Sequence, residues 1–439
     1  MQPENAAGTR EMQQSPDYWI SKTENPGEVL RDPEWIEAFN ARSFETDPNL
    51  ADLTRYPASV PGKEVARLIR SVSKPNETDL YYRDDPEERQ VGPEDYQRYH
   101  ASLALDAVPE TVHVRFGLVL QRTNMRTWPA RDFVFRSPET RDLDRFQENG
   151  LFPGEMVAIL HESADGLWYF VRSYNYGSWI RKIRLVEGSR EEILDYVCTD
   201  RFLVVTGSRA TTNFNPVDAE ISELHLDMGV RLPLIEPDDM PAHVGGQNPV
   251  SSFAVQLPAK NEAGGLAFKT VLIGRGQDVR EGYLPYTPEN IIRQSFKFLG
   301  ERYGWGHSYN ARDCTGLVLE VFRSMGIMLP RNSSQQGSSP VGETTLFAEG
   351  ESAEERLEVL TGADVGDLVY SPGHAMIFLG FDEGEPYVIH DMSGSGWVDE
   401  KGDPIEGIMN GVAVTSLLST QMTPEMTYFE KIYAIKKIR

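Results

Sequence analysis

The spacing of hydrophobic positions changes twice along the chain. In residues 1–105, one clear helical pattern lies between Pro61 and Pro75, where apolar residues recur three and four positions apart. The apolar positions of this pattern are Val65, Leu68, Ile69 and Val72. The rest of the stretch is rich in charge and proline, which predicts loops and short helices. Because it has too few apolar stretches for a large core of its own, we expect it to wrap around other domains.

From about residue 110 the pattern changes to short apolar stretches bounded by Gly, Pro, Asn or Asp, which is typical of strands separated by turns. The stretches form two sets along the chain. The first set comprises residues 112–120, 156–160 and 168–171, and the second comprises 202–205, 230–234, 253–257 and 270–273. Two small β-barrels are the economical interpretation.

Near residue 287 the helical spacing returns. Thr287-Pro288-Glu289 supplies an N-cap, a proline at the first helical position and an acid in the first turn. A helix, a loop, another helix and several strands follow, which predicts a separate α+β domain. We therefore expect four parts: a helical and irregular segment (1–108), a first barrel (109–195), a second barrel (196–284) and an α+β domain (285–439).

Composition narrows the classes of partner. The 439 residues suggest about three domains at roughly 150 residues each. The formal net charge of −24 argues against nucleic acid or an anionic membrane surface as the main partner. No apolar run approaches the roughly 18 residues of a membrane span. Residues 1–15 show no apolar signal segment, although a protein whose signal has been removed would begin in the same way.

The two cysteines, Cys198 and Cys314, are too few for a disulfide framework, and they lack the spacing of a zinc ribbon. We expect Cys198 to pack at the end of a short helix without function. Cys314 follows a candidate N-cap, Asp313, at the start of an apolar helical stripe that Gly326 would end. The positive end of the helix favours a thiolate, and its free N–H groups suit an oxyanion. The alternative to a reactive thiol is that Cys314 serves only as a small buried apolar residue at a helix start.

Two histidines follow on predicted strands. If the strands form a hairpin centred near Glu383, His374 lies opposite Met392 and His390 lies opposite Met376. The histidines are then diagonal neighbours on one face, with their backbones about 7–8 Å apart. One imidazole would take the thiol proton while the other orients it, as in cysteine hydrolases. The alternative is two unrelated strand histidines.

The motifs of residues 288–439 resemble, in their order, those of the NlpC-type cell-wall cysteine peptidases. The matching segments are Leu299–Gly306, Asp313–Val318, Leu329–Gln336, Gly366–Val369 and the strands of His374 and His390. The resemblance implies that Cys314 is the nucleophile, His374 the general base and His390 the residue that orients it, with Tyr303 near the oxyanion. Two positions depart from the family: His307 replaces a glycine, and Thr315 replaces the commoner serine.

The upstream barrels are similar to bacterial SH3-like domains in residues 168–172 and 176–180. This resemblance implies that the first barrel helps close the substrate site, with Tyr176 as a contact; a surface aromatic is the alternative. Asp313 and Thr315 would line the pocket for the amino end of the substrate, and a pure N-cap role competes for Asp313.

Together these resemblances imply a papain-like catalytic domain preceded by two SH3-like barrels and a mostly helical amino-terminal segment. The implied activity is hydrolysis of the γ-D-glutamyl to L-diamino-acid amide (meso-diaminopimelate or Lys) of peptidoglycan stem peptides, releasing L-Ala-γ-D-Glu from peptides with a free N-terminal L-Ala. We expect a monomer that acts on stem peptides or muropeptides, without cofactor, metal, nucleic acid or transmembrane segment. The expected location is the bacterial cell envelope or periplasm, with the cytoplasm as the alternative.

Three other interpretations remain open at the level of sequence. Zinc accepts a ligand set such as Cys314, His374, His390 and His307, although no short metal-binding spacing is present. A cysteine- and histidine-dependent amidohydrolase would share the Gly373-His374 strand but cut a different cell-wall amide. A non-catalytic cell-wall binding protein would use the barrels and carry an inactive last domain.

Overall fold

The computed structural model describes residues 9–85, 87–139, 141–348, 350–394, 396–398, 404–405, 409–423 and 426–439. Contacts within the chain divide it into two compact units. The carboxyl-terminal unit comprises the chain up to Leu50, Tyr283–Gly304 and Asn310–Arg439. The barrel unit comprises Ala51–Gly282 and Trp305–Tyr309. The expected boundaries near residues 108, 195 and 284 stay predictions.

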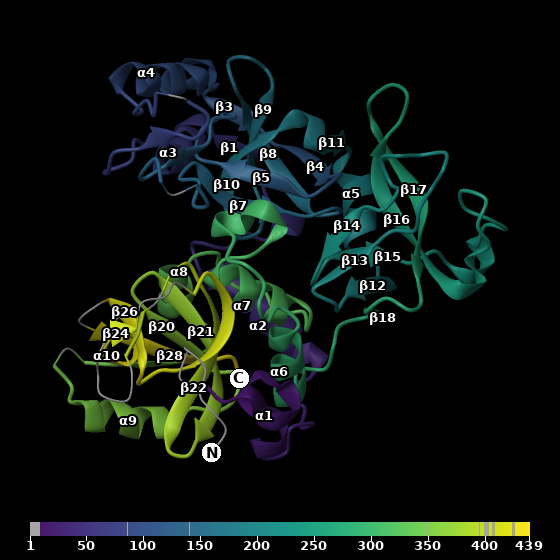
Figure 1. Ribbon diagram of the computed structural model, residues 1–439. Coiled ribbons are helices and arrows are strands. Elements are labelled where there is room, and N and C mark those ends of the chain that lie inside the picture. The colour runs from purple at the N-terminus through teal and green to yellow at the C-terminus, as the bar shows by residue number, and fades with distance from the viewer. Residues whose placement is uncertain are drawn as a thin grey trace. The chain divides into compact units, whose positions relative to one another are not determined.

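A six-stranded antiparallel sheet in the order β19-β28-β20-β21-β22-β25 forms the centre of the carboxyl-terminal unit (Figure 1). Its strands are β19 (Glu343–Leu346), β20 (Leu368–Ser371), β21 (His374–Asp382), β22 (Glu385–Met392), β25 (Gly411–Ser416) and β28 (Ala434–Lys437). A small sheet of β23 (Gly396–Val398), β24 (Pro404–Ile405), β26 (Thr420–Thr423) and β27 (Met426–Thr427) accompanies it. The helices are α1 (Pro16–Lys22), α2 (Pro33–Thr46), α6 (Pro288–Phe296), α7 (Cys314–Arg323), α8 (Ser333–Ser338), α9 (Ala353–Thr361) and α10 (Tyr428–Lys431).

Helix α7 begins where the sequence predicts. The Asp313 carboxylate accepts a hydrogen bond from the backbone N–H of Gly316 at 2.8 Å and thereby caps the helix. Gly326 has a φ of +86°, a left-handed conformation that glycine adopts readily just past a helix. Every residue from Cys314 to Phe322 is buried, so the first turn of α7 lies inside the unit. The predicted cap of α6 is confirmed as well, since the Thr287 hydroxyl accepts from the N–H of Asn290.

The hairpin of β21 and β22 has the predicted register at the end that carries the histidines. Ile377 pairs with Ile389, so the register places His390 opposite Met376. A bulge between Phe378 and Gly380 shifts the register only toward the turn. The two histidines therefore share one face of the sheet, and β25 lies beside β22.

The amino-terminal segment contains one helix that the sequence analysis missed. The expectation of short helices alongside the one clear pattern is wrong for α2, which has 14 residues. Its buried stripe consists of Ile36, Phe39 and the polar Ser43, so the hydrophobic spacing is weak. Asn40 also joins α2 to the end of α7, because its amide donates to the Gly326 carbonyl at 2.8 Å.

The turn between β21 and β22 is held by the amino-terminal helices. The Asp382 carboxylate accepts hydrogen bonds from Gln13 (2.6 Å), Tyr18 (2.7 Å) and Lys22 (2.5 Å), and it also pairs with Arg10. Burial alone would raise the pKa of Asp382, but these hydrogen bonds outweigh burial and lower the pKa to about 2.

The Asp382 cluster should therefore stabilise the fold at neutral pH. Asp382→Asn should lower the free energy of unfolding by about 2 kcal/mol, since each pKa unit corresponds to about 1.4 kcal/mol. Because the folded-state pKa is depressed, the contribution is present above about pH 4 and is lost as the pH falls toward about 2. Urea unfolding of both proteins from pH 7 to 2 checks this. Glu383→Gln, at an exposed partner of Arg10, is the matched control, and an equal loss there would contradict the assignment.

A seven-stranded sheet in the order β11-β4-β8-β9-β10-β5-β7 forms the first part of the barrel unit. Its strands are β4 (Arg115–Val119), β5 (Thr123–Arg126), β7 (Gln147–Leu151), β8 (Met156–Glu162), β9 (Trp168–Arg172), β10 (Gly177–Arg181) and β11 (Leu185–Gly188). Around it lie β1 (Ser59–Pro61), β2 (Tyr81–Tyr82), β3 (Thr111–His113), β6 (Val134–Phe135), α3 (Gly62–Val72), α4 (Pro93–Ser102) and α5 (Arg190–Val197). The helix predicted between Pro61 and Pro75 is confirmed as α3.

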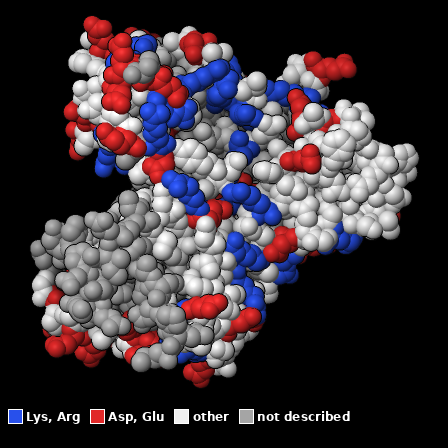
Figure 2. All heavy atoms as spheres, in the orientation of Figure 1, with Lys and Arg blue, Asp and Glu red and all other residues white. Residues whose placement is uncertain are grey.

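The second part of the barrel unit has its own apolar core, which includes Leu203, Leu226, Val255 and Ile273. Its strands are β12 (Phe202–Val205), β13 (Arg209–Thr211), β14 (His225–Asp227), β15 (Arg231–Pro233), β16 (Ser252–Lys260), β17 (Leu266–Gly274) and β18 (Val279–Glu281). Each apolar stretch predicted in this part coincides with a strand. Figure 2 shows acidic and basic side chains together on the face drawn. Within the described residues, none of the helices has the length and apolar character needed to cross a membrane.

Candidate active site

The start of α7 places the Cys314 thiol against the first residues of β21. Cys314 Sγ lies 4.0 Å from the carbonyl oxygen of Gly373, the residue before His374. The backbone N–H of Ala375, the residue after His374, also interacts with the thiol, and this contact partly opposes the larger effect of burial, which raises the pKa of Cys314. The cysteine is only 6% exposed, so it lies in a largely desolvated position beside the histidine strand.

The two histidines predicted to be neighbours are hydrogen bonded. His374 Nε2 lies 2.7 Å from His390 Nδ1, and the second ring nitrogen of His390, Nε2, lies 2.8 Å from Thr415 Oγ1 on β25. The ring of Tyr428 packs against both imidazoles, with centroids 5.0 and 5.5 Å away. Since Nε2 of His374 is engaged by His390, Nδ1 is the nitrogen left to take a proton from a thiol.

Burial keeps the thiol and both imidazoles neutral. It raises the pKa of Cys314 to about 12, and the Asp313 carboxylate adds to this effect. Burial also lowers the pKa of His374 to about 4 and that of His390 well below its usual range. The expectation that the helix start would favour a thiolate is therefore wrong for this resting state, because loss of water outweighs the helix dipole. The arrangement suits a thiol that loses its proton to His374 during the reaction.

Tyr303 lies in the same electrostatic environment. Its ring is 5% exposed, and burial raises the pKa of its hydroxyl well above 10, with further contributions from Cys314 and Asp313. The backbones of Tyr303 and Arg312 pair in an isolated parallel β-bridge, two residues before the cysteine. A phenol that keeps its proton is a hydrogen-bond donor, as an oxyanion requires.

Arg331 joins the two residues that flank Cys314. Its guanidinium donates to Asp313 Oδ2 at 2.6 Å and to Thr315 Oγ1 at 2.5 Å, and all three side chains are buried. The Thr315 hydroxyl also donates to Asp313 Oδ1 at 3.1 Å. Arg331 lies in the segment Leu329–Gln336 that resembles a family motif, which is the signal for it in the sequence. Its contacts with Asp313 and Thr315 are visible only in the fold.

Replacing Arg331 should destabilise the fold through this cluster. Arg331→Met leaves the Asp313 carboxylate buried without its cation, so we expect a loss of about 3 kcal/mol in the free energy of unfolding. Arg331→Lys keeps the charge but loses the two-pronged geometry and should lose less. Chemical denaturation checks both, with Arg42→Met on the exposed side of α2 as control. A loss for Arg331→Met no larger than for the control would contradict the assignment.

Three residues singled out in the sequence lie apart from this cluster. Tyr176 belongs to the barrel unit, where its hydroxyl donates to the Glu148 carboxylate at 2.5 Å, and its role with substrate stays a prediction. His307, also in the barrel unit, packs edge-on against Phe152 and has a φ of +66°, a conformation that favours the glycine of the family motif. Cys198 follows α5, but it is exposed, so the expectation that it is packed is wrong.

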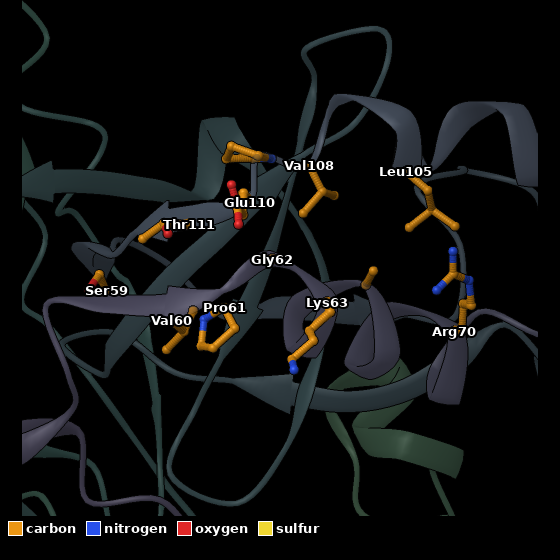
Figure 3. Close-up of a pocket in the computed structure, with 12 residues that line it drawn as sticks. Ser59, Val60, Pro61, Gly62, Lys63, Arg70, Leu105, Val108, Glu110 and Thr111 are labelled. Carbon is orange, nitrogen blue, oxygen red and sulfur yellow. The ribbon is translucent and has the colours of Figure 1, made fainter.

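A cavity of about 790 Å³ in the barrel unit is a separate feature (Figure 3). It lies between α3 and the segment before β3, and its charged lining residues are Lys63, Arg70 and Glu110. None of the candidate catalytic or binding residues lines it. Among the described residues, no group of three or more His, Cys, Asp or Glu side chains is arranged to hold a metal ion.

An α+β domain with a thiol at a helix start beside two hydrogen-bonded histidines is an arrangement of the thiol-hydrolase kind. Residues 300–420 match the model of the NlpC/P60 family, and residues 134–181 match that of an SH3 domain of the SH3b1 type. The chain thus carries an SH3 domain followed by a carboxyl-terminal NlpC/P60 domain, which confirms the predicted family and the order of these two kinds of domain, while the second SH3-like barrel stays a prediction. These matches define the class of protein: a hydrolase of the NlpC/P60 family of cell-wall peptidases.

One solved structure shows the same fold over almost the whole chain. The chain is similar to an NlpC/P60 endopeptidase from Photobacterium damselae subsp. piscicida, with a TM-score of 0.72 and 16% identity over 94% of both chains. An NlpC/P60 family protein from Bacillus cereus ATCC 10987 matches with a TM-score of 0.49 and 17% identity, over 74% of this chain and 99% of that one. No curated protein matches the chain at a significant level.

Proposed function

We propose that the chain is a cysteine endopeptidase that hydrolyses the γ-D-glutamyl to L-diamino-acid amide of peptidoglycan stem peptides. The observation that carries the proposal is the place of the Cys314 thiol beside the strand of His374, whose imidazole is hydrogen bonded to His390, which in turn contacts Thr415. The family match supports the same chemistry. Because the proposed substrate belongs to the cell wall, we propose that the protein acts outside the cytoplasm.

The reaction would proceed by acyl transfer in two steps. His374 Nδ1 takes the thiol proton as Cys314 Sγ attacks the γ-carbonyl carbon of D-Glu, so a C–S bond forms and the carbonyl oxygen becomes an oxyanion. Backbone N–H groups at the start of α7 and the Tyr303 hydroxyl would stabilise the oxyanion. His374 then protonates the leaving amine as the C–N bond breaks. Water, with His374 as base, hydrolyses the remaining thioester and restores the thiol.

The residues around the nucleophile would set its position and the substrate pocket. Asp313 is already bonded to Gly316, Thr315 and Arg331, which supports a role as helix cap and anchor. A contact of Asp313 or Thr315 with the amino end of a substrate extends this proposal. Tyr176 is the proposed contact from the barrel unit, which would favour peptides with a free N-terminal L-Ala.

Mass spectrometry of products from defined muropeptides tests the proposal. The expected products are L-Ala-γ-D-Glu and a peptide beginning with the diamino acid, formed faster when the L-Ala amine is free. Cleavage at the sugar-lactyl bond or within a cross-bridge would indicate an amidase of different specificity. Binding of wall fragments without any product would indicate a non-catalytic binding protein. Equal cleavage of polymeric wall would contradict the role given to Tyr176 and the first barrel.

A further inference from the structure

The hydrogen bonds of the histidine pair end on Thr415, which no motif in the sequence marks. Thr415 lies on β25, is fully buried, and its hydroxyl contacts His390 Nε2 at 2.8 Å. His390 is also fully buried, so water does not reach its ring. A buried ring N–H without an acceptor costs free energy, which makes the partner at this position important.

Two arrangements of the ring protons fit the two nitrogen distances. In the first, His374 Nε2–H donates to His390 Nδ1 and His390 Nε2–H donates to Thr415 Oγ1, so Nδ1 of His374 keeps its lone pair. In the second, the Thr415 hydroxyl donates to His390 Nε2, His390 Nδ1–H donates to His374 Nε2, and Nδ1 of His374 carries the proton. Only the first arrangement provides a base for the Cys314 thiol.

We propose that Thr415 is a positioning residue whose hydroxyl oxygen accepts the Nε2–H of His390 during the reaction and thereby keeps Nδ1 of His374 available as the base. This inference rests on the proposed function. When the thiol proton reaches His374 Nδ1, the Nε2 protons of both rings stay in place. The positive charge polarises the bond to Thr415 Oγ1. The same Nδ1 proton later leaves with the amine, so the pair returns to its starting state.

The energetics favour a role in the reaction over a role in folding alone. A hydrogen bond from a charged donor is about twice as strong as one between neutral groups. Losing the Thr415 acceptor therefore destabilises the protonated pair more than the neutral pair. Thr415→Val should lower kcat about tenfold at neutral pH. The value of KM should stay unchanged, because a fully buried side chain does not touch the substrate.

The pH profile should shift in a defined direction. Without the acceptor, the protonated pair is less stable, so its pKa falls and the acid limb of kcat/KM moves to lower pH by up to about one unit. The other groups near the thiol and the pair are unchanged in the variant: Cys314 at the start of α7, its cap Asp313, Tyr428 from α10, Asp391 on β22, and Arg331, Tyr303 and Tyr370, which act on Cys314. The shift therefore reports the loss of the Thr415 hydroxyl.

The experiment compares Thr415→Val with Thr415→Ser, which keeps the hydroxyl and should restore both kcat and the acid limb. Thr420→Val is the matched control, since Thr420 is also fully buried but its hydroxyl donates to the Ser416 carbonyl at 2.7 Å. Where valine disturbs packing, Thr415→Ala replaces it. An acid limb and kcat that stay unchanged in the folded Val or Ala variant would overturn the proposal, as would an equal shift in Thr420→Val.

A second measurement needs no substrate. The rate at which iodoacetamide alkylates Cys314, followed on its own peptide by mass spectrometry from pH 4 to 10, reports proton transfer from the thiol to His374. Thr415→Val should slow alkylation about tenfold near pH 7, and Thr415→Ser should restore it. If Cys314→Ala kept full turnover, the proposed function would fail, whereas unchanged alkylation in Thr415→Val would refute the positioning role alone.

Discussion

Cys314→Ala should reduce turnover of a stem peptide by several orders of magnitude while the protein stays folded. The proposed reaction passes through a thioester on Sγ, and alanine supplies no nucleophile to replace it. The side chain removed is small, so the free energy of unfolding should change by only about 1 kcal/mol. Product formation followed by mass spectrometry, together with thermal unfolding, separates loss of chemistry from loss of fold.

The chain offers a matched control for this experiment. Cys198 is also a free cysteine, but it is exposed at the end of α5. Cys198→Ala should leave turnover within about twofold of the parent, because surface substitutions away from a site have small effects. Unchanged turnover in Cys314→Ala, or an equal loss in Cys198→Ala, would contradict the assignment of Cys314 as nucleophile.

The parts of the site that follow local rules were predictable. The cap at Asp313 and the start of α7 depend on residues within one turn of each other, so the sequence contains the whole signal. The predicted register, which places His374 and His390 on one face, is present as well, but it also depends on the bulge between Phe378 and Gly380, because at the turn Asp382 pairs with Glu385, one position out of step with the Ile377–Ile389 pair. These two local features bring the candidate nucleophile and base to one end of the carboxyl-terminal unit.

The remaining features depend on contacts between segments far apart in the chain. Arg331 reaches back to Asp313 and Thr315, and Thr415 meets His390 only because β25 lies beside β22. Their partners come from tertiary packing, which no periodicity encodes. The raised pKa of Cys314 has the same origin: the helix dipole is a local property, whereas the desolvation that outweighs it requires the folded unit.

The contacts of the amino-terminal segment are also between residues far apart in the chain, and the sequence does not predict them. Lys22 and Tyr18 bind Asp382, about 360 residues away along the chain, and fix the turn that joins the two histidine strands. The sequence of this segment has little hydrophobic periodicity, so helix α2 is not predicted at its full length of 14 residues. Polar contacts to one buried carboxylate, together with the packing of Trp19 against Tyr387 on β22, attach it to the hairpin.

His374→Ala should lower kcat by about 10²- to 10⁴-fold, the usual contribution of a positioned general base. The thiol alone does not compensate, because burial raises the pKa of Cys314 to about 12 and leaves it protonated at neutral pH. In the parent, the pKa of His374 near 4 means that the base is neutral at pH 7 and that activity falls as the pH drops toward 4. In the variant this acid limb should vanish, and the residual rate should rise with pH as the thiolate forms.

The pH profile of His374→Ala distinguishes loss of the base from a disturbed hairpin. Loss of kcat alone would also follow from a disturbed hairpin, whereas a rate that climbs steadily from pH 5 to 10 requires a thiol that has lost its base. His113→Ala, at an exposed histidine on β3, is the control and should keep both the rate and the acid limb. An acid limb that persists in His374→Ala would show that a different group takes the thiol proton. The contacts from His374 through His390 to Thr415 would then serve the fold rather than the reaction.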